Sequence, residues 1–126
     1  MKLFVYGTLR KGGANHTFLD KAILLKENCW VYGELHDTKK GYPILKDHQN
    51  AIVWGEVYEV NQELLNHVDV LEGYSHTGSD NEYIRVIRQI YTEGYTLHAF
   101  VYIAGKTFHN CDQLIKSGNW FDVKPM

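Results

Sequence analysis

Apolar and polar positions alternate along much of the chain and predict a fold dominated by strands. The candidate strands are short β-type segments that end at glycine, proline or polar turns, and they cover residues 2–6, 22–35, 42–46, 51–60, 82–91 and 95–103. Segment 22–35 is expected to form one long or bent strand, and Pro43 places segment 42–46 at a sheet edge or in an extended loop. Glu93 and Gly94 separate the last two segments, which predicts a hairpin.

The two arms of this hairpin follow the period of a strand. Ile84, Val86 and Ile90 share one face of the first arm, while Tyr83 belongs to the other face. In the second arm, the odd positions from 97 to 103 are all apolar. The second arm therefore has a wholly apolar face.

One helix is indicated between Asn61 and Gly73. Asn61 can cap its first turn, Glu63 suits the helix dipole there, and Gly73 is a natural residue after the last turn. The buried stripe is expected to consist of Leu64, Leu65, Val68 and Leu71. Shorter helical turns are expected near residues 14–19 and 111–116. Strands of mixed spacing with one good helix predict an α+β fold with a curved or barrel-like sheet.

Glu72 is a candidate general base because of its place on this helix. At about 100° per residue it lies roughly 20° from Leu65 on the helical wheel, inside the apolar stripe. It also occupies the last turn, where the helix dipole disfavours a negative charge. Both effects raise the pKa of a carboxyl group towards neutrality, which suits acid–base work. The alternative is that the helix frays at Gly73 and that Glu72 pairs with a surface cation.

A glycine turn follows the first predicted strand. The segment Tyr6-Gly7-Thr8-Leu9-Arg10 is followed by Gly12 and Gly13. A strand that ends in such a turn exposes successive N–H groups, which can hold an anion or an oxyanion. The spacing matches neither of the glycine motifs that bind nucleotides, so nucleotide binding is unsupported. The alternative is an ordinary glycine turn.

Length and composition narrow the possible classes of protein. The 126 residues suit a single domain spanning 1–126, and 44% hydrophobic with 22% charged residues is typical of a globular protein. The net charge is −2 and no basic cluster exceeds Lys39-Lys40, which argues against nucleic acid as a partner. The apolar runs are too short to span a membrane, and the N-terminus lacks the features of a signal peptide. Cys29 and Cys111 lie far apart in the sequence, so we expect reduced thiols and a cytoplasmic location.

No metal or cofactor site is predicted. The chain has seven histidines, but none has the spacing of metal ligands. Those in turn-like stretches are expected at the surface, namely His36, His48, His76 and His109. Buried, inert thiols are favoured over a cysteine nucleophile, because nothing near Cys29 or Cys111 in the sequence activates either thiol.

Several motifs, taken in order, resemble one known family. They are Val5-Tyr6-Gly7-Thr8-Leu9-Arg10-Lys11-Gly12, Tyr42-Pro43, Gly55-Glu56-Val57-Tyr58, Val68-Asp69-Val70-Leu71-Glu72-Gly73-Tyr74, Tyr83-Ile84-Arg85, Ala99-Phe100-Val101-Tyr102 and Ser117-Gly118-Asn119-Trp120. With them the chain resembles the gamma-glutamylcyclotransferase-like family over nearly its whole length. The opening motif together with Leu71-Glu72-Gly73-Tyr74 is more specific than either motif alone.

The resemblance implies a small mixed β-barrel with flanking helices and a cavity at the end of the first strand. Members of this family release 5-oxoproline from gamma-glutamyl amines or amino acids, without a metal or cofactor. The catalytic glutamate of the family matches Glu72, and a late tyrosine that lines the pocket matches Tyr102. The substrate-holding loop of the family matches Tyr6, Gly7, Thr8 and Leu9. We therefore expect an enzyme that binds a small gamma-glutamyl substrate.

The sequence departs from the family in one segment and leaves two alternatives open. Segment 74–82 is long for the family, so it forms either a rim that selects the substrate or a plain surface loop. It brings Glu82 next to Tyr83 and makes Glu82 the second candidate carboxylate. The residues that could hold the α-carboxylate of the substrate are Tyr83, Arg85 and Tyr102, and Arg85 is best suited to a bidentate contact. The alternatives are a non-catalytic protein that binds a small metabolite or a partner in the same cavity, and an enzyme that uses Glu72 on another acyl group.

Overall fold

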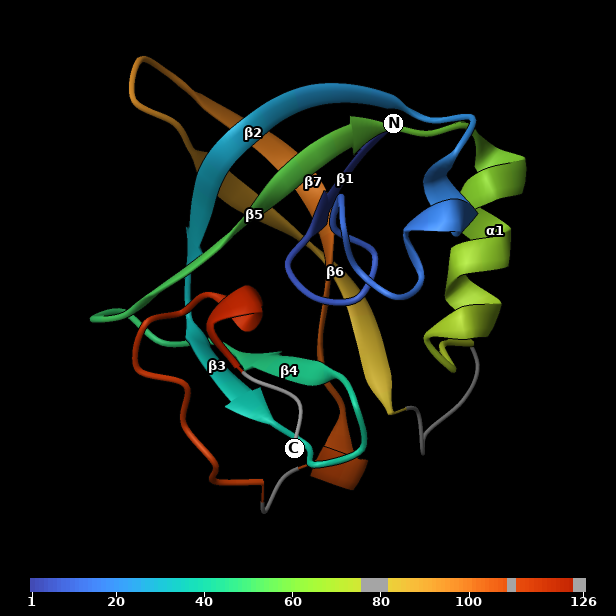
Figure 1. The fold of residues 1–126 in the computed structure, drawn as a ribbon. Coiled ribbons are helices and arrows are strands. Elements are labelled where there is room, and N and C mark those ends of the chain that lie inside the picture. Colours follow the sequence, from blue (N-terminus) through green and yellow to red (C-terminus); the bar gives the residue numbers. More distant parts are fainter. Residues whose placement is uncertain (76–81, 109–110, 124–126) are drawn as a thin grey trace.

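The computed structural model describes residues 1–75, 82–108 and 111–123. Within these ranges the chain forms, in order, β1 (Lys2–Val5), η1 (His16–Leu19), β2 (Ile23–Tyr32), β3 (Glu34–Asp37), β4 (Pro43–Lys46), β5 (Ile52–Glu59), α1 (Gln62–Leu71), β6 (Tyr83–Tyr91), β7 (Thr96–Ala104), η2 (Lys106–Phe108) and η3 (Trp120–Asp122). The α-helix and the 3₁₀ helix η1 lie side by side on one side of the sheet (Figure 1). The helical turn expected near 14–19 is thereby confirmed as η1.

The sheet closes into a barrel in the strand order β1, β5, β2, β6, β7. β1 pairs antiparallel with β5 along its length, and its other edge pairs in parallel with β7 at Leu3 and Phe100. β6 and β7 form the predicted hairpin, in which Tyr83 lies opposite Ala104. A closed barrel with a flanking helix confirms the expected α+β fold with a barrel-like sheet.

Segment 22–35 is not one strand, contrary to the prediction. β2 ends at Tyr32, and β3 begins at Glu34 in a separate two-stranded sheet with β4. At Gly33, between them, a β-carbon would lie 3.0 Å from the carbonyl oxygen of Lys46. The chain therefore leaves the barrel at this residue, and β4 carries Pro43 in an edge strand, as the sequence indicated.

The helical turn expected near 111–116 is wrong, because the structure of these residues is extended against β3. Leu114 forms a β-bridge with His36. The N–H of Ile115 donates to the carbonyl oxygen of Leu35 at 2.8 Å. The backbone groups of this segment thus form hydrogen bonds with β3 instead of with each other in a helical turn.

The contact of residues 111–116 with β3 also buries His36. His36 is only 6% exposed, so its expected surface position is wrong. His48 is exposed, as predicted, whereas His76 and His109 lie outside the described residues. The turn-like composition around His36 did not reveal the segment that packs over it.

The buried apolar side chains of the described residues form two clusters on opposite faces of the sheet. One contains Phe4, Tyr6, Cys29, Val31, Leu35, Leu45, Val53, Val57, Ile90, Ala99, Val101 and Ile103. The other contains Leu3, Val5, Leu9, Leu19, Ile44, Tyr58, Val60, Leu65, Val68, Tyr83, Tyr102 and Phe108. Because α1 contributes to the second cluster, this cluster lies outside the barrel. The barrel residues of the first cluster lie inside it, and Leu35 and Leu45 of the separate β3–β4 sheet pack with them. Ile90 and Tyr83 fall on opposite faces of β6, as the alternation predicted.

Helix α1 begins and ends where the sequence placed its caps. The side-chain oxygen of Asn61 accepts a 2.8 Å hydrogen bond from the N–H of Leu64. Gly73 follows the helix with φ +66°, a left-handed conformation that glycine adopts without strain. Leu65 and Val68 are buried against the outer cluster. This packing brings the C-terminal end of α1 next to the end of β1.

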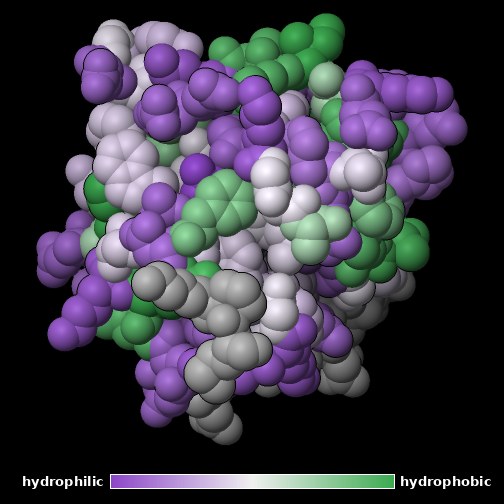
Figure 2. Space-filling view, in the orientation of Figure 1, coloured by the Kyte–Doolittle hydropathy of each residue, from purple (hydrophilic) through white to green (hydrophobic). Residues whose placement is uncertain are grey.

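The face in Figure 2 is largely hydrophilic, and its hydrophobic groups lie in separate patches. Exposed apolar side chains include Ile23 and Leu25 of β2 and Val70 of α1. Among the described helices, none has the length and apolar character needed to cross a membrane.

Candidate active site

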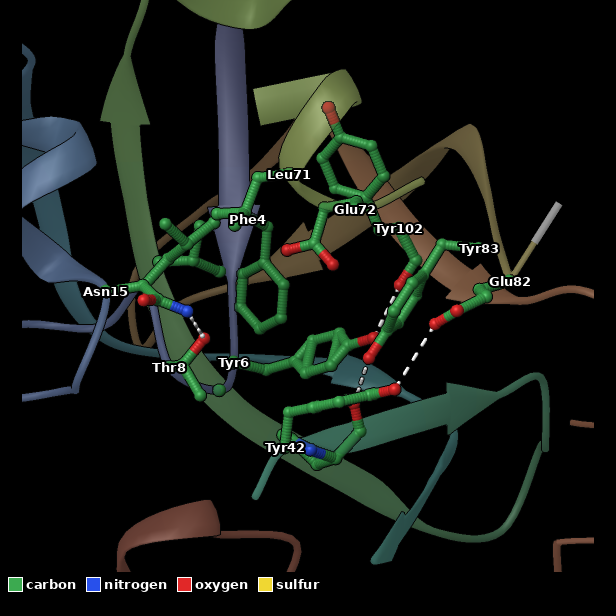
Figure 3. Close-up of a pocket in the computed structure, with 14 residues that line it drawn as sticks. Phe4, Tyr6, Thr8, Asn15, Tyr42, Leu71, Glu72, Glu82, Tyr83 and Tyr102 are labelled. Atoms are coloured by element: carbon green, nitrogen blue, oxygen red, sulfur yellow. Dashed lines mark hydrogen bonds between the residues drawn. The ribbon is translucent and has the colours of Figure 1, made fainter. Parts of the chain in front are cut away.

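A cavity of about 290 Å³ opens where β1 ends, beside the C-terminal end of α1 (Figure 3). Its walls are residues of β1 and the turn that follows, of α1, of β4 and of the hairpin: Phe4, Val5, Tyr6, Gly7, Thr8, Leu9, Asn15, Tyr42, Pro43, Leu71, Glu72, Glu82, Tyr83 and Tyr102. Of the site residues predicted from the sequence, Arg85 is the one that does not line this cavity. The fold thus brings the others together from three separate segments: the end of β1 with its turn, the end of α1, and the hairpin of β6 and β7.

Glu72 is the residue that caps the C-terminal end of α1, and its side chain points into the cavity. Its carboxylate forms no hydrogen bond or ion pair with any residue that the structure describes, so it does not pair with a surface cation. Burial, and secondly the negative charge of Glu82, raise its pKa to about 7. A carboxyl group with this pKa accepts and returns protons readily at neutral pH.

Buried tyrosines surround this carboxylate. The Tyr6 hydroxyl donates to the carbonyl oxygen of Tyr102 at 2.6 Å, and the Tyr83 hydroxyl donates to the carbonyl oxygen of Pro43 at 2.5 Å. Burial, together with nearby negative groups, holds the pKa of each tyrosine well above its ordinary value. These hydroxyls therefore stay protonated and neutral, and none of them replaces Glu72 as a base.

Asp69 lies one helical turn before Glu72 and ties α1 to the barrel. Its carboxylate accepts a 2.5 Å hydrogen bond from the Tyr102 hydroxyl and forms a 2.5 Å ion pair with Arg85. The Arg85 guanidinium also lies 4.8 Å from the centre of the Phe100 ring, a cation–π contact. Arg85 is therefore engaged with Asp69, outside the cavity in which it was expected to hold a carboxylate.

Asp69 was not among the residues predicted for the site, although the sequence contains a signal for it. Asp69 follows Leu65 by four residues and precedes Glu72 by three, so all three share one face of the helix. A charged residue on a buried face needs a partner. Its partners, Tyr102 and Arg85, lie in the hairpin, and the pattern of residues around Asp69 does not predict them.

The turn after β1 is fixed by Glu56 of β5. Nε of Arg10 donates to Oε2 of Glu56 at 2.7 Å, and the N–H of Lys11 donates to Oε1 at 2.8 Å. Nδ2 of Asn15 donates to the hydroxyl oxygen of Thr8 at 3.0 Å. Arg10 thus points to Glu56 instead of the cavity, and its role is to hold the shape of the turn.

The turn that lines the cavity contains N–H groups without an acceptor among the described residues. The N–H groups of Gly7, Thr8 and Leu9 donate to no acceptor in the described part of the chain. A β-carbon at Gly7 would come within 2.8 Å of the ring of Pro43, so only glycine allows these two walls to approach so closely. Free N–H groups beside a cavity can stabilise a developing oxyanion.

Glu82, the second candidate carboxylate, lies at the exposed rim of the same cavity. Its Oε2 accepts a 3.2 Å hydrogen bond from the hydroxyl of Tyr42, drawn as a dashed line in Figure 3. Tyr42 was part of a sequence motif but was not predicted as a site residue, and it reaches the cavity because β4 packs below the barrel opening. Most of segment 74–82, expected to form a rim or a surface loop, lies outside the described residues.

The described residues do not favour metal or thiol chemistry. No group of three or more His, Cys, Asp and Glu among them is arranged to hold a metal ion. Cys29 is buried inside the barrel, and burial raises the pKa of its thiol to about 11. The thiol is therefore not a thiolate at neutral pH.

Fold and site together define a class of protein. It is a small barrel whose cavity holds a carboxylate of near-neutral pKa beside a glycine turn. Among the described residues, neither this carboxylate nor the N–H groups of the turn have a partner, a combination suited to acid–base chemistry on a small acyl substrate. Residues 3–122 match the model of the family described as "Gamma-glutamyl cyclotransferase, AIG2-like". The chain belongs to this family, as the motifs of the sequence indicated.

Individual relatives agree with this assignment. The chain is 41% identical over 102 residues to Gamma-L-glutamyl-butirosin B gamma-glutamyl cyclotransferase of Niallia circulans, and the match covers 80% of this chain and 65% of the relative. The crystal structure of YkqA from Bacillus subtilis is similar with a TM-score of 0.75 at 27% identity, over 96% of this chain and 39% of YkqA. A Pyrococcus horikoshii protein of known structure has a TM-score of 0.70 at 27% identity, over 97% of this chain and 91% of its own. This chain therefore spans less than two thirds of the first two relatives and nearly all of the third.

Proposed function

We propose that the protein is a gamma-glutamyl cyclotransferase that converts the gamma-glutamyl group of a small substrate to 5-oxoproline and releases an amine or amino acid. The observation that carries this proposal is Glu72, a carboxylate inside the cavity with a pKa of about 7 and no partner among the described residues. The family of the chain supports it. So does the Niallia circulans relative, whose name gives a gamma-glutamyl conjugate as its substrate.

The reaction needs a group that moves protons, and Glu72 is suited to that role. The carboxylate takes a proton from the α-ammonium of the substrate, and the free amine then attacks the gamma-carbonyl carbon and forms the lactam C–N bond. Protonated Glu72 gives its proton to the departing nitrogen as the old amide C–N bond breaks. The lactam nitrogen loses its second proton to the regenerated carboxylate, and the released amine finally takes up that proton.

Two further features of the cavity lower the barrier to this reaction. The N–H groups of Gly7 to Leu9 would donate to the oxyanion that forms on the gamma-carbonyl oxygen, an effect worth about 3–4 kcal/mol per donor. The cavity walls would hold the glutamyl arm in the curled conformation that the reaction needs. This conformation is rare in water, so binding it lowers the barrier. Because the attacking amine belongs to the substrate, the protein needs no nucleophile of its own.

The test is the release of 5-oxoproline. The purified protein is incubated with a panel of gamma-glutamyl amines and gamma-glutamyl amino acids, and the product is detected by mass spectrometry. Glu72→Gln should lower turnover about 10²–10⁴-fold, the usual cost of losing an acid–base group. Glu63→Gln, an exposed carboxylate on the same helix, is the matched control and should retain turnover.

One result would contradict the proposed activity, and another would contradict only the role of Glu72. If the wild-type protein binds members of the panel but releases no 5-oxoproline, the cavity belongs to a binding protein. If Glu72→Gln retains turnover while Glu82→Gln abolishes it, the base is Glu82.

A further inference from the structure

We propose that Glu82 and Tyr42 form a subsite for a positive charge on the departing amine, so that the enzyme prefers gamma-glutamyl amides whose amine part carries a second ammonium group. This inference rests on the proposed function, because the subsite belongs to the cavity that contains Glu72. It goes further by naming the chemical class of the leaving group.

The first argument is the charge of the cavity. Among its described lining residues, the charged ones are Glu72 and Glu82, and both are acidic. Two arginines close to the cavity walls are paired elsewhere: Arg85 with Asp69, and Arg10 with Glu56. A leaving group with a free carboxylate would therefore meet like charge, whereas an ammonium group would meet opposite charge.

The second argument is the geometry at the rim. The hydroxyl of Tyr42 donates to Oε2 of Glu82 at 3.2 Å and orients that carboxylate, while no described residue occupies Oε1. The ring of Tyr42 lies 6.3 Å from that of Tyr83, so the carboxylate stands beside two aromatic side chains of the cavity wall. A carboxylate next to aromatic rings is a favourable environment for an alkylammonium group.

The third argument is that Glu72 and Glu82 repel each other when both are ionised. Glu72 is a buried carboxylate that points into the cavity without a partner among the described residues, and the charge of Glu82 makes its ionisation harder. A bound cation at Glu82 offsets this repulsion and helps Glu72 to act as a base. The rim carboxylate therefore has a use in substrate selection that a neutral residue would not supply.

The experiment compares two substrates of nearly equal size. One is the gamma-glutamyl amide of 1,4-diaminobutane, which carries a terminal ammonium group, and the other is the gamma-glutamyl amide of pentylamine, in which a methyl group replaces it. The quantity measured is the ratio of the two kcat/KM values. A ratio cancels any change in Glu72 that affects both substrates alike.

We expect a ratio of about five in the wild-type protein at low salt, as suits a partly exposed charge pair, and a decrease of this ratio as salt is added. Glu82→Gln should bring the ratio to about one, and Glu82→Lys should reverse the preference. Glu93→Gln is the matched control, because Glu93 is an exposed carboxylate in the hairpin turn at the far end of β6 and β7 (Figure 1). It should leave the ratio unchanged.

A ratio near one in the wild-type protein overturns the inference, and so does a preference that survives in Glu82→Gln. These results leave the proposed function intact, because both substrates still release 5-oxoproline. If neither these two amides nor any member of the panel described above releases 5-oxoproline, the proposed function fails. The subsite is then tested by the affinities of the two amides in calorimetry, where the same loss of preference in Glu82→Gln supports it and equal affinities refute it.

Discussion

The hydroxyl of Tyr102 donates a 2.5 Å hydrogen bond to the carboxylate of Asp69, and this contact joins β7 to helix α1. The same carboxylate pairs with Arg85 at 2.5 Å, with both side chains about nine-tenths buried. Because Asp69 lies one turn before Glu72, the position of the candidate base depends on a buried ion pair outside the cavity.

Asp69→Asn should therefore destabilise the protein. The amide keeps the shape of the side chain but leaves the buried Arg85 charge without its partner, and breaking such a pair costs about 3–5 kcal/mol. Urea unfolding measures the loss. Asp47→Asn is the control, because Asp47 pairs with Arg88 at 2.6 Å on the surface, where the two side chains are 52% and 35% exposed, and such pairs are worth about 0–1 kcal/mol. Equal losses in the two variants would show that the Asp69 pair does not anchor the helix.

Glu72→Gln should change stability in a pH-dependent way. Burial raises the pKa of Glu72 from 4.5 to about 7 in the folded protein. Between these values the folded state holds a proton that the unfolded state has lost, so the free energy of unfolding falls as pH rises, and the full cost is present above pH 7. The stability of Glu72→Gln relative to wild type should thus be about 3 kcal/mol more favourable at pH 8 than at pH 4.

Urea unfolding of both proteins at the two pH values checks this difference, with Glu63→Gln as the exposed control. A difference between Glu72→Gln and wild type that is the same at both pH values would mean that Glu72 does not titrate abnormally. Such a result would also remove the reason for choosing it as the base.

The pH dependence of activity should report the same group. Glu72 must be ionised to accept a proton, so kcat/KM should fall below a pH of about 7. In Glu82→Gln the like charge is gone, and the acid limb should move to lower pH. The shift should be partial, because burial is the larger cause of the raised pKa. An acid limb at the same pH in both proteins would show that Glu82 does not act on the titrating group.

Gly7→Ala should suppress turnover in the folded protein. The new β-carbon would come within 2.8 Å of the Pro43 ring and displace the turn that presents N–H groups to the cavity. Gly94→Ala is the control, because a β-carbon at Gly94 meets no described atom within 4 Å. Thr8→Ala should be milder, since the backbone and not the hydroxyl would stabilise the oxyanion. Turnover is measured per folded molecule, and full activity of folded Gly7→Ala would eliminate the oxyanion role of this turn.

Activity should not depend on a metal ion. The sequence has no ligand spacing among its histidines and cysteines, and the proposed steps use only proton transfer and N–H donors. Dialysis against a chelator should leave the release of 5-oxoproline unchanged. A loss of activity that added zinc restores would contradict this prediction.

Local patterns determined much of this protein. Asn61 and Gly73 mark the ends of α1 because capping and left-handed φ depend on single residues and their immediate neighbours. The alternation in β6 and β7 predicted the hairpin for the same reason. Glu72 could be selected because the helical wheel placed an acidic residue on an apolar stripe.

Tertiary structure alone decided the rest. The break at Gly33, the burial of His36 and the pairing of Asp69 with Arg85 depend on segments that are distant in sequence. The sequence raised Glu82 as a candidate, but its contact with Tyr42 exists only because β4 packs beneath the barrel opening. Periodicity reports which face of an element is buried, and it does not report which other element covers that face. The sequence by itself thus determined the elements and the candidate carboxylates, and the closure of the barrel determined which of their side chains share one cavity.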